Sequence, residues 1–222
     1  IVESLKNKNA VRQKLANFYE GIYQGKQVIV CQPPIGLINT AAAVTWALEK
    51  YKPDHILNIG VANGYLHIHV GEVVVGLSTI NISSMKTGEH AQGQKSSPDN
   101  WELISYRYGE RDKLIDQRAD EDFVEKFKTF EMMNESKNIN YGVIGSGDII
   151  NKEYDRIEFL ADNYNVLCED MAGVAVYTVA NAYGIPALDV RIVSKNESMK
   201  EREERDTGLK LQSLILKFIE FM

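Results

Sequence analysis

The sequence predicts a single α/β domain built around a largely buried sheet. Short, continuous apolar segments such as residues 55–59 are typical of strands covered on both faces, and helical segments alternate with them along most of the chain. The length of 222 residues fits one domain, residues 1–222, and a hydrophobic content of 44% can supply its core. The apolar runs all fall well short of the ~18 residues of a membrane-spanning helix.

The first half of the chain is expected to lead from a loose or helical segment into strands. Residues 1–20 carry scattered apolar positions, and residues 21–27 look like a hairpin. The Ala-rich segment 39–50 predicts a helix, with Asn39 or Thr40 as its N-cap. The strands expected around it are residues 28–31, 55–59 and 70–75.

The second half is expected to alternate strands and helices after a long polar segment. Residues 83–118 are polar and irregular, which is typical of functional lids or disordered loops. Residues 171–183 are small and apolar and predict a buried helix, while residues 209–222 predict an amphipathic closing helix. The other expected elements are helices at 120–137 and 152–163 and strands at 141–144, 166–168 and 187–193.

The composition argues against several classes of partner. The net charge is −6, whereas a nucleic acid or a membrane surface needs a basic protein face, so we expect no nucleic acid and no membrane as partner. Cys31 and Cys168 lie in apolar segments and are expected to be buried thiols in a reducing, cytoplasmic setting. Residues 1–5 read like the interior of a sequence, so we expect that the N-terminus is incomplete.

Three short segments, each after a predicted strand, are candidates for chemistry. The small residues 60–64 would let a ligand approach the backbone at a strand end, although a tight turn explains them equally well. Asp148 and Asp170 could meet at one sheet edge and stabilise an oxocarbenium-like transition state, or could simply cap helices. Ser194 and Lys195 follow the last strand, where a cap and a solvated lysine are the alternatives.

Neither a metal nor another cofactor is expected. His67 and His69 alternate along one predicted strand face, but a third ligand from His55 or His90 is unsupported. The glycines at 60 and 64 do not form a dinucleotide-binding pattern.

Several motifs follow one another in a characteristic order. They are Ile35–Ala42 (IGLINTAA), Lys52–Asp54 (KPD), Asn58–Gly64 (NIGVANG), Val70–Val74 (VGEVV), Ser146–Asp148 (SGD), Glu169–Met171 (EDM) and Gly184–Pro186 (GIP) before Val190–Ser194 (VRIVS). From about Tyr19 to the C-terminus, this set resembles the nucleoside phosphorylase superfamily, specifically its branch of 5′-methylthioadenosine/S-adenosylhomocysteine nucleosidases, whose patterns include N-x-G-S-A-G-G and V-E-M-E. The resemblance implies a central mixed, curved sheet flanked by helices.

The resemblance also implies a purine nucleoside as ligand and hydrolysis of its ribose–base bond, in an adenine nucleoside such as 5′-methylthioadenosine or S-adenosylhomocysteine. Phosphate-using members place a Ser where Val61 stands, which favours hydrolysis over phosphorolysis. Relatives of this branch pair through apolar helices, so we expect a homodimer. The open alternatives are a catalytically impaired nucleoside-binding or storage-type member, a purine nucleoside phosphorylase, and an interaction module unrelated to nucleosides.

Two catalytic carboxylates of the family are replaced in this chain. Lys195 occupies the place of the general acid, so either its ammonium or the amide of Asn196 would donate to the purine. Ala172 occupies the place of the ribose-binding Glu, through an altered lineage or a deliberate Glu→Ala substitution. For the water-activating Glu, Glu3 is a poor candidate. The substrate-binding residues that the resemblance implies are Ile35, Gly36, Ala62, Asn63, Gly64, Ile150, Asn151, Glu169, Met171 and Ala172.

Overall fold

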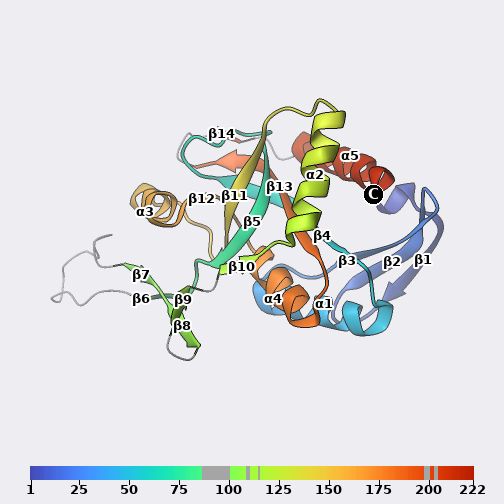
Figure 1. Ribbon diagram of the computed structural model, residues 1–222, viewed down its shortest axis with the longest axis horizontal. Helices are drawn as coiled ribbons and strands as arrows, with labels where there is room; N and C mark the ends of the chain where they lie inside the picture. The colour runs from blue at the N-terminus through green and yellow to red at the C-terminus, as the bar shows by residue number, and fades with distance from the viewer. Residues whose placement is uncertain (87–100, 109–110, 115, 198–200, 203–204) are drawn as a thin grey trace.

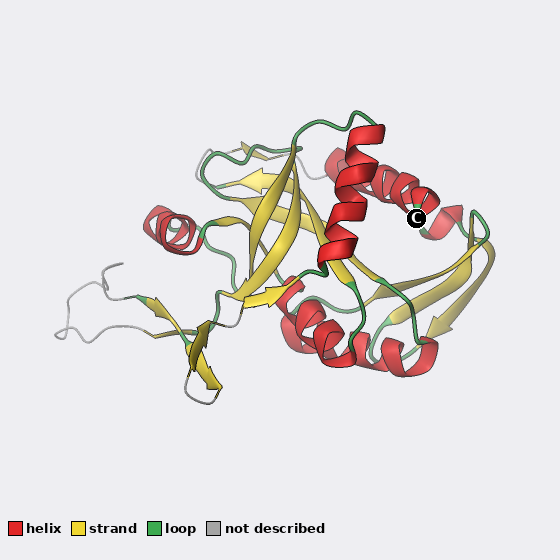
Figure 2. Ribbon diagram, in the orientation of Figure 1, coloured by secondary structure: helices red, strands yellow, loops and turns green. Residues whose placement is uncertain are grey.

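A curved sheet that closes on itself forms the centre of the molecule, with helices around it (Figures 1 and 2). The computed structural model describes residues 1–86, 101–108, 111–114, 116–197, 201–202 and 205–222. The strand order in the sheet is β10-β5-β11-β12-β4-β13-β14. These strands are β4 (Ile56–Gly64), β5 (Val73–Asn81), β10 (Asp116–Arg118), β11 (Ile139–Ser146), β12 (Val166–Asp170), β13 (Ala187–Asn196) and β14 (Glu201–Arg202).

The sheet closes because β13 pairs with β5 as well as with β4. The seam between β5 and β13 is antiparallel and runs through Asp189 and Gly76. Tyr177 joins its two sides, because its hydroxyl donates to Gly76 O and accepts from Asp189 N, both at 2.7 Å. The β4–β13 and β5–β11–β12 pairings are parallel whereas β12–β4 is antiparallel, which confirms the predicted mixed, curved sheet.

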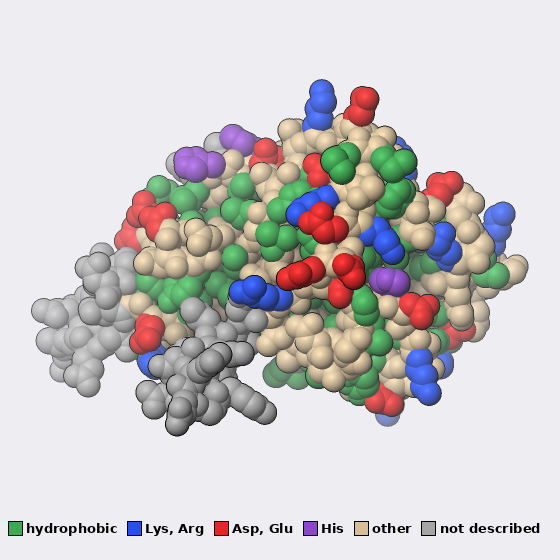
Figure 3. Space-filling model, viewed as in Figure 1, with side chains coloured by type: hydrophobic (Ala, Val, Ile, Leu, Met, Phe, Trp, Pro, Cys, Tyr) green, Lys and Arg blue, Asp and Glu red, His purple; other side chains and the backbone are tan. Residues whose placement is uncertain are grey.

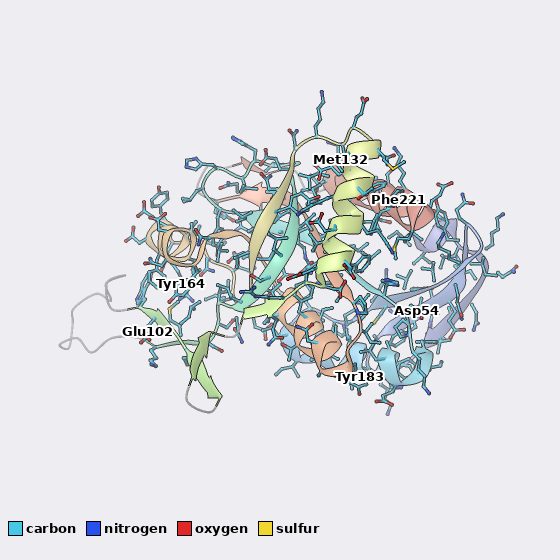
Figure 4. The ribbon with its side chains drawn as sticks, viewed as in Figure 1. Asp54, Glu102, Met132, Tyr164, Tyr183 and Phe221 are labelled. Carbon is cyan, nitrogen blue, oxygen red and sulfur yellow. The ribbon has the colours of Figure 1, made fainter. Side chains whose placement is uncertain are left out.

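The described part of the chain has five helices around this sheet. They are α1 (Leu37–Tyr51), α2 (Glu121–Met133), α3 (Tyr154–Tyr164), α4 (Gly173–Tyr183) and α5 (Arg205–Phe221). On one side α2 and α5 bury the aromatic rings of Phe123, Phe127, Phe130 and Phe218 against β13 and β5. In Figure 4, Met132 on α2 points outward and is 72% exposed. The small residues of α4 let it pack closely on β13 and on α1, as the predicted buried helix requires.

The expectation of a loose or helical segment over residues 1–20 is wrong. After a 3₁₀ turn at Val2–Ser4, this segment forms β1 (Lys6–Arg12) and β2 (Asn17–Tyr23), which join β3 (Lys26–Gln32) in a separate three-stranded antiparallel sheet. Almost every residue of β1 is exposed, so its sequence lacks the alternating pattern that marks a half-buried strand. Phe18 anchors the sheet by packing against Trp46 of α1. Glu3 lies on the surface in an ion pair with Lys8 at 3.1 Å.

The polar segment 83–118 was expected to be irregular and is partly ordered. It forms β6 (Met85–Lys86) with β7 (Glu102–Leu103), and β8 (Ser105–Tyr108) with β9 (Arg111–Leu114), before β10. Figure 4 labels Glu102 and Tyr164 beside each other, and the Tyr164 hydroxyl accepts from the backbone of Leu103 at 3.1 Å. Residues 87–100, with His90, lie outside the described part of the chain.

The structure shows the burial of the two cysteines and the distribution of charge on the surface. Cys168 is buried, as expected, whereas Cys31 is only half-buried, and both are free thiols. Burial raises the pKa of Cys31 to about 11. On the face in Figure 3, Lys and Arg side chains are scattered among Asp and Glu. Within the described ranges, no helix combines the length and the apolar character needed to cross a membrane.

Candidate active site

The three segments singled out in the sequence come together at one end of the closed sheet. Strand register places Asn63 of β4 beside Glu169 of β12 on one side and beside Lys195 of β13 on the other. One strand further, Ser146 of β11 is paired with Asp170. The ends of four strands therefore lie in one row, which is the convergence that a shared ligand site requires.

The segment 60–64 is the end of a strand, and the tight-turn interpretation is wrong. Gly60 and Gly64 do not have positive φ angles. They are needed for space, because a Cβ at Gly60 would collide with the guanidinium of Arg191 and one at Gly64 would lie 2.6 Å from Ile68 O. Ala62 is buried between these positions, whereas Val61 is 49% exposed.

Glu169 forms the centre of a buried polar cluster at this end of the sheet. Its Oε1 accepts from Asn63 Nδ2 at 2.9 Å and from the backbone N–H of Asn151 at 3.0 Å. Its Oε2 accepts from the Tyr65 hydroxyl at 2.6 Å and from Asn151 Nδ2 at 2.5 Å. Burial and the nearby carboxylate of Glu169 raise the pKa of Tyr65, which keeps the phenol protonated as a donor.

A second buried cluster joins β12 and β13 through Arg191. Its Nη2 lies 2.5 Å from Asp170 Oδ2, and its Nε donates to Asp189 Oδ1 at 2.7 Å. Burial opposes the charge of the guanidinium, but the two carboxylates outweigh that effect and raise the pKa of Arg191. For Asp189, burial raises the pKa to about 7, although Arg191 acts in the opposite direction.

Asp170 and Asp148 both accept from backbone N–H groups at helix starts, although Asp148 does so at the distant α1 and not at the α3 that follows it. The carboxylate of Asp170 accepts from Gly173 N at the first turn of α4 and from the Ser146 hydroxyl. Asp148 Oδ1 accepts from Leu37 N at 2.8 Å, so it caps α1 from a distant loop. This bond also holds the loop after β11 against the segment containing Ile35 and Gly36.

Several predicted ligand-binding residues lie exposed near these clusters. Ile35 is 77% exposed and Ile150 is 52% exposed, while Gly36 has a φ of 117° that favours glycine. Met171 and Ala172 are half-buried, and Ala172 is the N-cap of α4 with no side-chain bond to its first turn. The side chain at position 172 therefore offers no hydrogen-bonding group, and the carboxylate of Asp170 bonds to Gly173 N beside it.

The two residues predicted to donate a proton differ in their surroundings. Lys195 has a side chain that is 25% exposed, with Nζ at 3.5 Å from Glu197 Oε1. Asn196 is completely buried, and its Nδ2 donates to Leu66 O at 3.2 Å and Ile68 O at 2.8 Å. The prediction that Asn196 donates to the purine therefore needs correction, because its amide hydrogens already bind the backbone. Ser194 is also buried, with its hydroxyl 3.4 Å from Ala62 O, and does not act as the predicted cap.

Three residues of these clusters, Tyr65, Asp189 and Arg191, were given no role in the sequence-based predictions. Tyr65 follows the glycine-rich strand end and was not considered, although a tyrosine after small residues can supply a buried hydroxyl. Arg191 was noted only as part of a motif. The sequence feature that could have identified Arg191 is the pattern Asp189-x-Arg191 in an otherwise apolar strand. Strand residues two positions apart face the same side, and buried charged residues are usually paired.

The described residues form no group of three or more His, Cys, Asp or Glu side chains that could hold a metal ion. His67 and His69 are both exposed.

Comparison with known proteins agrees with this geometry. A family model described as the phosphorylase superfamily matches residues 1–220. A 5′-methylthioadenosine/S-adenosylhomocysteine nucleosidase of Bacillus pumilus (strain SAFR-032) is 27% identical over 192 residues, which cover 84% of this chain and 77% of the relative. The enzyme of the same name from Bacillus cereus (strain B4264) is 28% identical over 180 residues, covering 80% and 71%.

Solved structures show the same fold at lower sequence identity. A nucleosidase of that name from Neisseria meningitidis, in complex with methylthio-immucillin-A, superimposes with a TM-score of 0.79 at 20% identity, covering 99% of this chain and 92% of that one. A futalosine hydrolase mutant of Helicobacter pylori strain 26695 reaches 0.77 at 16% identity, covering 98% and 90%. At these identities the likeness establishes the architecture.

Proposed function

This chain belongs to the phosphorylase superfamily, and we propose that it binds a purine nucleoside and hydrolyses its ribose–base bond. The preferred substrate class is an adenine nucleoside such as 5′-methylthioadenosine or S-adenosylhomocysteine. The observation that carries the proposal is the row formed by Asn63, Glu169 and Lys195 across three neighbouring strand ends. An interaction module would not require these segments to converge.

In the proposed complex, the purine lies against the end of β4 and the loop before α3. Ala62, Asn63 and Gly64 form one wall, and the backbone at Ile150 and Asn151 reads the edge of the base. Ile150 is half exposed beside the buried Asn151, so this loop has a face available to a ligand. Met171 packs under the ribose beside Ala172, and Ile35 and Gly36 border the opening.

The proposed reaction separates charge between the two halves of the nucleoside. Breaking the ribose–base bond leaves positive charge on the ribose ring and negative charge on the purine, so a donor at the purine lowers the barrier. Lys195 is the proposed donor, because its ammonium is partly exposed at the strand end. Water is the proposed nucleophile at the ribose carbon, and phosphate is the alternative that the release assay distinguishes.

A second candidate function is binding of a purine nucleoside with little or no turnover. Ala172 supports it, because a methyl group cannot hydrogen-bond the ribose hydroxyls that a carboxylate would hold. The position of Asn196 also supports it, because its buried amide leaves Lys195 as the single proposed donor. A purine nucleoside phosphorylase remains the third alternative.

Release of free purine distinguishes these functions. The chain is incubated with 5′-methylthioadenosine, S-adenosylhomocysteine, adenosine and inosine, each with and without inorganic phosphate, and the base is quantified by chromatography. Hydrolysis predicts phosphate-independent release that falls about 10-fold or more in Lys195→Met, while Lys126→Met, at an exposed lysine of α2, serves as the control. Phosphate-dependent release would identify a phosphorylase. Calorimetric binding without release would identify a binding protein, and neither binding nor release would reject the proposal.

We also propose that the chain forms a homodimer. The apolar surfaces of α1 and α4 that suggested this expectation partly cover each other. Ile38 near the start of α1 is nevertheless 81% exposed, and with Ile35 it provides apolar surface for a partner. Sedimentation of the wild type and of Ile38→Glu tests this proposal, which predicts a dimer that the substitution weakens.

A further inference from the structure

We infer that Glu169 is a positioning residue that fixes the two segments proposed to face the purine. This inference rests on the proposed function, and it concerns how the binding wall is held rather than what reacts. Glu169 is 4% exposed at the end of β12, and both of its carboxylate oxygens are engaged by donors from the protein. The carboxylate of Glu169 therefore does not face the substrate as a direct ligand.

The four donors to Glu169 come from two separate parts of the chain. Asn63 and Tyr65 belong to the end of β4 and the residue after it, while Asn151 lies in the irregular loop between β11 and α3. Asn63 Nδ2 also lies 3.5 Å from Asn151 O. The start of the loop is held by Gly147 N donating to Asp170 O and by Leu37 N donating to Asp148, and the bonds to Glu169 hold it at Asn151.

A carboxylate at this position also fixes the orientation of two amide side chains. A carboxylate can only accept hydrogen bonds, so the amino groups of Asn63 and Asn151 must face Glu169. Their Oδ1 atoms then point away, and within the described residues each is buried without a hydrogen-bond partner. A neutral residue at 169 would remove this constraint and let both amides rotate.

Positions 63 and 169 of this chain differ from the two family patterns that it resembles. The motifs that carry the family resemblance have Gly at position 63 and Val at position 169, and this chain has polar residues at both. A buried carboxylate is costly unless several donors satisfy it. Tyr65 and Asn151 supply three of the four donors to Glu169, and Asn63 supplies the fourth.

Hydrogen exchange of the full chain, measured without ligand, tests the anchoring directly. In Glu169→Met, which keeps the length of the side chain but removes every acceptor, we expect exchange at least about 10-fold faster in segments 61–66 and 147–153. Segment 17–32, in the separate N-terminal sheet, should be unchanged. Glu169→Gln keeps one acceptor oxygen and should restore part of the protection. Glu158→Met and Glu158→Gln, at an exposed glutamate of α3, are the matched controls.

The affinity for adenosine, measured by calorimetry, completes the test. We expect about 10-fold weaker binding in Glu169→Met and an intermediate value in Glu169→Gln. An unchanged exchange rate in segment 147–153 of Glu169→Met would overturn the inference. An equal increase of the exchange rate in segment 17–32 would also overturn it, because Glu169 would then stabilise the whole fold rather than the loop. Faster local exchange with unchanged affinity would overturn it too. If Glu169→Met does not fold, Glu169→Gln alone decides. If the wild type binds no purine nucleoside, the proposed function fails, while exchange still decides whether Glu169 holds the loop.

Discussion

Arg191 of β13 reaches across the neighbouring strand to pair with Asp170 of β12. The strand between them is β4, and Gly60 is the β4 residue that pairs with Arg191. Arg191 Nη2 lies 2.5 Å from Asp170 Oδ2, and a Cβ at Gly60 would collide with Nη1 of the same guanidinium. The ion pair therefore connects the middle of β13 to the end of β12, across β4, through a gap that only glycine leaves open.

Replacing Arg191 by Met should strongly destabilise the protein. The change leaves Asp170 and Asp189 buried without their cation, and breaking a buried pair in this way costs about 3–5 kcal/mol. Chemical denaturation at pH 7 measures the loss, with Lys210→Met on the exposed side of α5 as the control. A loss below about 1 kcal/mol would show that the ion pair contributes little to the fold.

Gly60→Ala should destabilise the wild type by about 1–3 kcal/mol, because the new methyl group displaces the guanidinium. Gly60→Ala should lower the unfolding free energy by less in the Arg191→Met background, because the flexible thioether side chain of Met replaces the planar guanidinium. Unfolding free energies of the two single variants and the double variant form a cycle, and we expect a coupling of at least about 0.5 kcal/mol. Additive effects would indicate that Gly60 is required for another reason.

Asp189 should make the protein less stable as the pH rises from about 4 to 7. Its pKa is raised from 3.8 to about 7 in the fold, chiefly by burial. The folded state therefore binds more protons than the unfolded state in this range, so the unfolding free energy falls with rising pH and levels off above pH 7. In Asp189→Asn this slope should be reduced, with a change on the order of 1–4 kcal/mol between pH 4 and 7.

Denaturation curves at pH 4, 5, 6, 7 and 8 provide this comparison. Asp54→Asn, at the exposed aspartate labelled in Figure 4, removes the same charge from the surface and should leave the slope unchanged. Equal slopes in wild type and Asp189→Asn would mean that Asp189 stays ionised over the whole range.

The parts of the fold that the sequence predicted are those with strong local patterns. Residues 55–59 and 187–193 are rich in apolar residues, and both lie largely in central strands. The polar β1 escaped prediction because pairing with β2, rather than burial, holds it in place. Closure of the sheet escaped too, because the pairing of β13 with β5 joins residues more than a hundred positions apart and has no local signal.

The candidate site shows the same division between local and long-range information. The strand-end segments were predicted to meet, and the structure places Asn63 beside Glu169. The sequence could not show which side chains form hydrogen bonds within the protein, because those bonds depend on the register between strands. Asn196 and Glu169 were both expected to face a ligand, yet both are buried and hydrogen-bonded within the protein.

Restoring a carboxylate at position 172 should strengthen binding of nucleosides that carry both ribose hydroxyls. In Ala172→Glu, the new side chain stands at the N-terminus of α4, where the helix dipole favours negative charge. Hydrogen bonds to a charged group contribute about 1.5–3 kcal/mol each, so we expect at least about 10-fold tighter binding of adenosine and faster release of adenine. Calorimetry with 2′,3′-dideoxyadenosine is the matched control, because this ligand lacks both hydroxyls and its affinity should not increase. An equal gain for both ligands would place the new carboxylate away from the ribose, and no gain for either would contradict the proposed orientation of the nucleoside over Met171 and Ala172.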